Sequence, residues 1–139
     1  MKTLSPTEAW AWLQDQQAQC AASGKEPPLF VDVRMEIESL YVGRPPGVEN
    51  IPWYEYPDLT PDPERFAQAV EREAGHKGRA VLLICRSGKR TQDAARALES
   101  AGFSDVSHVM HGFEGELNQH FQRSSVNGWR HDGLPWEQM

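Results

Sequence analysis

The chain has 139 residues, which fits one domain, and its 39% of hydrophobic residues are enough to form a core. The net charge of −6 argues against nucleic-acid binding, which needs a basic face. No apolar run approaches the ~20 residues that span a bilayer, and Met1 to Pro6 show no signal-peptide core. We therefore expect a cytoplasmic protein without nucleic-acid or membrane partners.

The first half of the chain predicts two helices and a buried strand. A capping box at Ser5 to Glu8 predicts a helix that ends near Ser23 and Gly24. Leu29 to Val33 predicts a buried strand, and the Gly/Pro-rich passage after it allows only a short extended segment within Val48 to Ile51. Asp62 is typical of a helix N-cap, and Gly75 is expected to end that helix.

The second half predicts two further strands around a helix. Ala80 to Ile84 is a short aliphatic run that predicts a buried strand, a helix follows from Thr91 to Ala101, and Val106 to Val109 predicts another strand. Because strands and helices alternate, we expect right-handed crossovers and a mainly parallel sheet. Ligands of such sheets bind beyond the carboxyl ends of the strands.

Cys85 is expected at this edge, at the start of a basic loop that leads into a helix. Loop amides, the helix dipole and three cationic side chains would all favour its thiolate, which is the reactive form. A cysteine after a buried strand is also often a small core residue, but such a residue gains nothing from basic neighbours. We therefore predict that Cys85 is a nucleophile. The residues after it are Arg86, Ser87, Gly88, Lys89, Arg90 and Thr91.

The remaining cysteine and the histidines show no site pattern. Cys20 has no basic loop around it and is expected to be structural. No metal-ligand spacing occurs, so neither a metal nor a cofactor is predicted. The histidines are scattered and are expected on the surface or in the core: His76, His108, His111, His120 and His131.

Segments along nearly the whole chain match one family in its own order. The most specific is the Cys-Arg-x-Gly-x-Arg pattern that begins at Cys85; the others are Leu4–Pro6, Phe30–Arg34, Gly47–Pro52, Ala101–Phe103, His111–Phe113 and Trp129 to Pro135. On these segments the chain resembles the rhodanese family of sulfurtransferases. The resemblance implies a single rhodanese domain over residues 1–139, with a three-layer α/β fold. Its central sheet would have about five mainly parallel strands, with helices on both faces.

The resemblance also implies a reaction without a cofactor. Cys85 would take the outer sulfur of thiosulfate or a related small anionic donor, and a thiol acceptor or cyanide would then remove it from the persulfide. The acceptor thiol is expected to be a small molecule or part of a sulfur-relay protein. The loop amides of residues 86–91 would bind the transferred sulfur, and Arg86 and Lys89 would attract the donor. Two roles for Arg90 stay open, namely donor binding and support of the loop. Asp32 and Arg34 are expected to support neighbouring loops.

Two single positions and one longer stretch depart from the family pattern. Arg44 stands where the family usually has histidine, and we keep it as a candidate supporting residue. His111 stands where glycine is common. An extra stretch from Asn118 to Asn127 could be a flap near the site, but we favour a surface loop.

Two other functions are compatible with this fold. Cysteine phosphatases and arsenate reductases also use an anion-binding loop, but the phosphatase signature has five residues between cysteine and arginine, whereas four lie between Cys85 and Arg90. The shorter loop encloses a smaller space, which suits sulfur better than phosphate. A non-catalytic rhodanese-like binding module is the other alternative, although such a module has no use for an activated cysteine.

Overall fold

Five strands form one parallel sheet in the computed structural model, which describes all 139 residues. All four strand pairs are parallel, which confirms the predicted sheet type. The order across the sheet is β1-β5-β4-β2-β3, and the bounds are β1 Lys2–Leu4, β2 Leu29–Asp32, β3 Glu49–Asn50, β4 Val81–Ile84 and β5 Val106–Val109.

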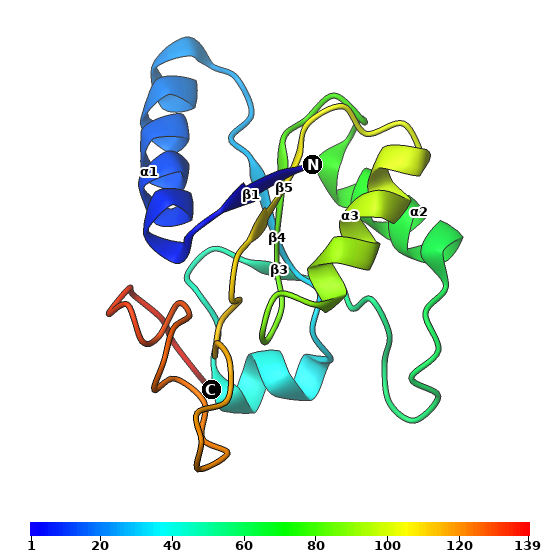
Figure 1. Cartoon of the computed structure of the whole chain (residues 1–139). Coiled ribbons are helices and arrows are strands. Elements are labelled where there is room, and N and C mark those ends of the chain that lie inside the picture. Colours follow the sequence, from blue (N-terminus) through cyan, green and yellow to red (C-terminus); the bar gives the residue numbers. More distant parts are fainter.

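Helices cover both faces of this sheet. One face carries α1, and the other carries α2 and α3, so the three layers agree with the expected fold class (Figure 1). None of these helices combines the length and apolar character that a membrane crossing requires. Their bounds are α1 Pro6–Ser23, α2 Pro63–Ala74 and α3 Arg90–Ser100, and a short π-helix, η1, spans Glu38–Val42.

Two helices, α1 and α2, begin where side-chain hydrogen bonds replace missing backbone partners. The Ser5 hydroxyl accepts the Glu8 amide at 3.2 Å, and the Glu8 carboxylate accepts the Ser5 amide at 2.9 Å, which confirms the capping box. The Asp62 carboxylate accepts the Arg65 amide at 3.2 Å and caps α2. The third helix begins at Arg90, one residue before the expected start.

Two elements were not predicted from the sequence. Strand β1 has only three residues, and its Lys2 and Thr3 are exposed, so no buried run announces it. The π-helix η1 follows Arg34 in a segment for which we predicted no helix. Both elements nevertheless contribute to the site described below.

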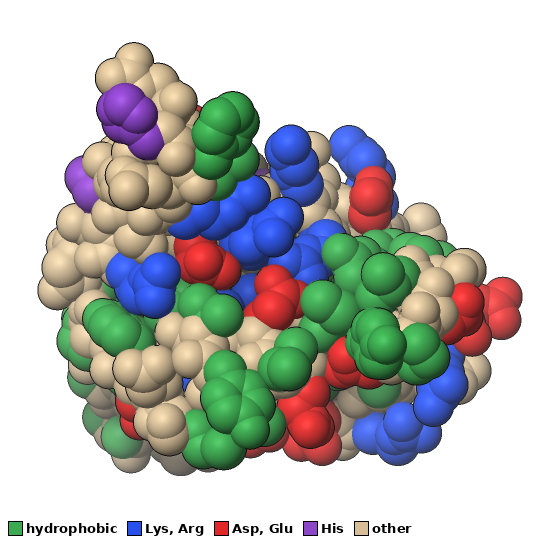
Figure 2. All heavy atoms as spheres, turned by 90° about the horizontal axis from the view of Figure 1, so that it is seen from below, with side chains coloured by type: hydrophobic (Ala, Val, Ile, Leu, Met, Phe, Trp, Pro, Cys, Tyr) green, Lys and Arg blue, Asp and Glu red, His purple; other side chains and the backbone are tan.

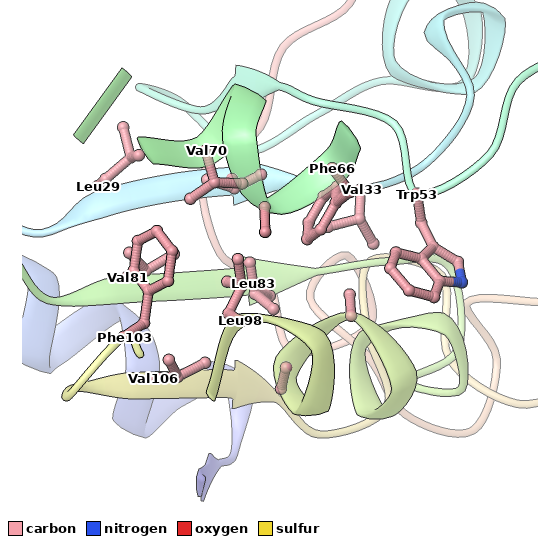
Figure 3. Packing of buried hydrophobic residues seen from close by; sticks show 14 of the residues in the cluster. Leu29, Val33, Trp53, Phe66, Val70, Val81, Leu83, Leu98, Phe103 and Val106 are labelled. Atoms are coloured by element: carbon pink, nitrogen blue, oxygen red, sulfur yellow. The ribbon is translucent and has the colours of Figure 1, made fainter. Parts of the chain in front are cut away.

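The core has two halves, one on each face of the sheet. The larger half packs between the sheet, α2 and α3, and includes Val70, Leu83 and Leu98 (Figure 3). Cys85 belongs to the same cluster. The other half lies under α1 and contains Trp129, which is fully buried although it belongs to the irregular tail. The Trp129 indole donates to the Pro135 carbonyl at 2.7 Å, so its polar atom is satisfied. The tail is therefore part of the packed structure.

Candidate active site

Cys85 lies directly after β4, at the carboxyl edge of the sheet, and its side chain is buried. Its Sγ accepts the Gly88 amide at 3.1 Å and lies 3.8 Å from the Thr91 hydroxyl. Gly88 is the only loop amide within hydrogen-bonding distance of Sγ, whereas the sequence predicted several. Gly88 adopts a φ of +93°, which glycine reaches without the strain that a Cβ would add. The loop thus curls over the sulfur at Gly88.

The start of the loop is held by the turn after β5. The Phe113 amide donates to the Cys85 carbonyl at 2.7 Å, and the Glu114 and Gly115 amides donate to the Arg86 carbonyl at 2.9 and 3.1 Å. These bonds fix the backbone of the first two loop residues. The turn also needs Gly112, because a Cβ there would overlap the Cys85 carbonyl and the Arg86 backbone.

The end of the loop is held by an ion pair between Arg90 and η1. The Arg90 guanidinium donates to both carboxylate oxygens of Glu38, at 2.8 and 2.9 Å, and lies 5.4 Å from the Tyr54 ring centroid. Burial acts to raise the pKa of Glu38, but the hydrogen bonds and charge of Arg90 outweigh it, so this pKa is lowered. Burial likewise acts to lower the pKa of Arg90, and Glu38 outweighs it and raises that pKa. Of the two roles left open for Arg90, the structure favours support of the loop.

Arg86 and Lys89 differ from Arg90 because both are exposed and neither has an ion pair or side-chain hydrogen bond. Figure 2 views the molecule from below the sheet and shows lysine and arginine side chains gathered near the middle of this face. Acidic and hydrophobic side chains surround them. The loop that begins at Cys85 therefore carries two cations without a counterion.

Asp32 and Arg34 form a fully buried pair beneath this edge. The guanidinium binds the carboxylate at 2.9 and 2.6 Å, donates to the Gly43 carbonyl at 2.6 Å, and lies 4.7 Å from the Phe113 ring centroid. Because Phe113 also holds the Cys85 carbonyl, this pair supports the loop indirectly. Neither residue makes a hydrogen bond with the Cys85 sulfur.

Arg44 makes no hydrogen bond or ion pair with residues 85–91. Its guanidinium donates to the Ser39 carbonyl at 3.4 Å and lies 3.5 Å from the Glu137 carboxylate, and the two backbones also form a bridge. Arg44 therefore ties the C-terminal segment to η1. The extra stretch from Asn118 to Asn127 also makes no hydrogen bond with residues 85–91, and it carries Phe121 with 84% of its surface exposed. It is a surface loop.

Two residues of this region, Glu38 and His108, were not predicted as site residues from the sequence. His108 is buried on β5; its Nδ1 lies 2.8 Å from the Thr91 hydroxyl and its Nε2 lies 3.0 Å from the Thr3 hydroxyl. Burial lowers the pKa of His108, and the positive charge of the Met1 ammonium lowers it further. The available signal for His108 was two adjacent polar residues, Ser107 and His108, inside a predicted strand.

Comparisons with known proteins agree with this geometry. A sequence model of the rhodanese-like domain matches residues 5–118. The crystal structure of Rv0390 from M. tuberculosis is 32% identical, superposes with a TM-score of 0.79, and the match covers 100% of this chain and 98% of that chain. A thiosulfate sulfurtransferase from Pseudomonas aeruginosa, 18% identical with a TM-score of 0.64 over 99% of this chain and 20% of that chain, shares the fold.

Two curated relatives match over shorter stretches. The thiosulfate:glutathione sulfurtransferase of Saccharomyces cerevisiae is 31% identical over 87 residues, which cover 60% of this chain and 62% of that protein. An uncharacterised protein of Rickettsia prowazekii is 34% identical over 58 residues, which cover 42% of each chain. The matches thus span less than two thirds of either relative.

Proposed function

The chain belongs to the rhodanese-like domain family, and from this premise we propose that it is a sulfurtransferase that carries sulfur on Cys85. The observation that supports this most directly is the contact of the Cys85 sulfur with the Gly88 amide, inside a loop held at both ends. An amide that points at the sulfur stabilises negative charge there, both on a thiolate and on the persulfide that replaces it. We also propose that residues 1–139 form a single domain of this kind.

The first half-reaction loads the cysteine. The Cys85 thiolate attacks the outer sulfur of thiosulfate, and the bond between the two donor sulfurs breaks with its electron pair on the departing sulfite. Cys85 is left as a persulfide, and no external oxidant or reductant is needed. Arg86 and Lys89 attract the dianionic donor, because they are the unpaired cations of the loop.

The second half-reaction unloads it. An acceptor thiolate attacks the outer sulfur of the persulfide, takes it as a new persulfide, and returns the Cys85 thiolate. The related yeast protein is named for thiosulfate and glutathione, which supports a thiol as the acceptor here. We propose a small thiol or a sulfur-relay protein in this role, in a cytoplasmic setting where thiols stay reduced.

Neither rival function gains support from the geometry. A phosphatase loop has five residues between its cysteine and its arginine, and only four separate Cys85 from Arg90. A non-catalytic module would not need two unpaired cations beside a cysteine. Insertion of a glycine into the loop tests the phosphatase alternative, and loading of sulfur on Cys85 tests the non-catalytic one.

Intact mass spectrometry after thiosulfate treatment tests the proposal. We expect one added sulfur, ~32 Da for a persulfide, located on Cys85 and removed by cyanide. Cys20 offers a matched control because it is the more exposed thiol, so simple accessibility would favour it over Cys85. Cys20→Ser should still load sulfur and Cys85→Ser should not. Sulfur on the Cys85→Ser protein would disprove the assignment.

A further inference from the structure

The strand register places His108 between two hydroxyl groups. Thr3 of β1 and Leu83 of β4 are its neighbours across the sheet, and Thr91 lies in the first turn of α3. His108 Nδ1 lies 2.8 Å from the Thr91 Oγ1, and Nε2 lies 3.0 Å from the Thr3 Oγ1. No other hydrogen bond of the His108 ring occurs. A chain of polar groups therefore runs from Thr3 through His108 and Thr91 to the Cys85 sulfur.

The Thr91 hydroxyl has one hydrogen and three neighbours that can accept it. These are His108 Nδ1 at 2.8 Å, the Gly88 carbonyl at 3.3 Å and, once the Cys85 thiol that donates to Thr91 at 3.8 Å has lost its proton, the Cys85 thiolate. The Gly88 carbonyl also accepts the Gln92 side-chain amide at 3.3 Å, so it does not depend on Thr91. If Nδ1 carries no hydrogen, it takes the hydrogen of Thr91. If Nδ1 carries one, it donates to Thr91 and leaves the hydroxyl hydrogen for the sulfur.

The surroundings of His108 favour a hydrogen on Nδ1. Its lowered pKa favours the neutral ring, which has one N–H. The Thr3 hydroxyl can donate to Nε2, and the ring hydrogen then lies on Nδ1. The charged or titratable groups that line the hollow of about 500 Å3 beside this ring make no hydrogen bond with it; they are the Met1 ammonium, Lys89, His111 and Glu116.

We propose that His108 is a positioning residue that donates its Nδ1–H to the Thr91 hydroxyl and so directs the hydroxyl hydrogen to the Cys85 thiolate. The inference rests on the proposed function only in that Cys85 acts as a nucleophile. A hydrogen bond to a charged group favours the charged form by ~10- to 100-fold. Loss of this bond should lower the reactivity of Cys85 by a factor in that range.

Four substitutions test this chain of hydrogen bonds, and the two at His108 distinguish the two nitrogens of the histidine ring. The amide of His108→Asn can stand in for Nδ1 and donate to Thr91, whereas the longer His108→Gln places its amide near the former Nε2, beside Thr3. Thr91→Val removes the hydroxyl and keeps the shape, and Thr91→Ser keeps the hydroxyl. Iodoacetamide alkylation of Cys85, followed by mass spectrometry, reports thiolate reactivity without any sulfur transfer.

We expect His108→Gln and Thr91→Val to slow alkylation ~10-fold or more near neutral pH. His108→Asn and Thr91→Ser should keep most of the original rate. At about pH 10, where an ordinary thiol is ionised, all rates should converge. A wild-type rate in His108→Gln, equal loss in His108→Asn and His108→Gln, or a difference that persists at high pH would each overturn the inference.

The same measurements keep the two proposals apart. If alkylation follows the expected pattern but thiosulfate never loads Cys85, the proposed function fails and the positioning role of His108 stands. If Cys85 loads sulfur but both His108 variants are alkylated at the original rate, only the positioning role of His108 fails. Urea unfolding of each variant shows whether the protein compared is folded.

Discussion

Removal of the Glu38 charge tests whether Arg90 supports the loop. Glu38→Gln keeps the shape of the side chain and one acceptor oxygen, but leaves the Arg90 guanidinium without its counterion. The two side chains are only 12% and 13% exposed, so water compensates little of the loss. Loss of the ion pair should also shift the loop around Cys85, because Arg90 lies at the end of this loop and begins α3.

The burial of the pair sets the size of the effect. Loss of one partner from a fully buried ion pair costs ~3–5 kcal/mol, and loss from an exposed pair costs under ~1 kcal/mol. The Arg90–Glu38 pair is mostly buried and glutamine keeps one hydrogen bond, so we expect Glu38→Gln to lower the free energy of unfolding by ~2 kcal/mol. If the loop moves by ~1 Å, persulfide formation should slow ~100-fold at saturating thiosulfate.

The pH dependence of this effect has a defined sign. The pKa of Glu38 is lowered from its usual value of 4.5 in the folded state, so the ion pair stabilises the protein fully above that value. The stabilisation is lost as the pH falls through the folded pKa. The stability difference between the original protein and Glu38→Gln should thus be constant down to about pH 4.5 and shrink below it.

Urea unfolding and thiosulfate turnover measure both effects, and the chain offers a matched control. Asp93 pairs with Arg96 at 3.2 Å on the exposed face of α3, where the side chains are 64% and 65% exposed. Asp93→Asn removes the same charge from an arginine and should cost under ~0.5 kcal/mol, with no loss of turnover. If Glu38→Gln and Asp93→Asn behave alike, the Arg90–Glu38 pair does not support the loop.

Two further predictions concern the loop backbone. Gly112→Ala should destabilise the protein by ~1–3 kcal/mol more than Gly24→Ala, because both glycines have positive φ but only a Cβ at Gly112 would overlap the Cys85 carbonyl; equal losses in urea unfolding would contradict the clash. Insertion of one glycine between Gly88 and Lys89 should widen the loop, lower thiosulfate turnover ~100-fold and allow phosphate or arsenate to bind, while the original protein shows negligible hydrolysis of p-nitrophenyl phosphate. Undiminished thiosulfate turnover in the insertion variant would reopen the phosphatase interpretation.

The sequence predicted the parts of the fold that depend on near neighbours. The caps at Ser5 and Asp62 each need a partner three residues away, and both formed as expected. The buried strand before Cys85 is a continuous aliphatic run, so its type and position were also predictable. The position of the loop after Cys85 was predictable as well, because the loop connects this strand to the predicted helix that comes next.

Contacts between distant parts of the chain were not predictable in this way. Glu38 and Arg90 are 52 positions apart, and only the fold brings η1 to the start of α3. Thr3 and His108 are 105 positions apart and meet because β1 adds to the sheet beside β5, although β1 is too short and exposed to show a pattern. The sequence alone therefore does not predict which cation of the loop, Arg86, Lys89 or Arg90, is already paired.

The pairing of Arg90 bears on how an acidic protein can attract an anionic donor. With Arg90 neutralised by Glu38, the positive charge available at the loop comes from Arg86 and Lys89. At physiological ionic strength, charges beyond ~8 Å are largely screened, so the net charge of −6 on the whole chain has little effect on a donor near Cys85. The nearest charges and dipoles act on the donor instead, and the loop contributes two free cations and the Gly88 amide. The loop can therefore bind anions while the rest of the surface stays acidic, and this local effect requires that Arg86 and Lys89 remain unpaired.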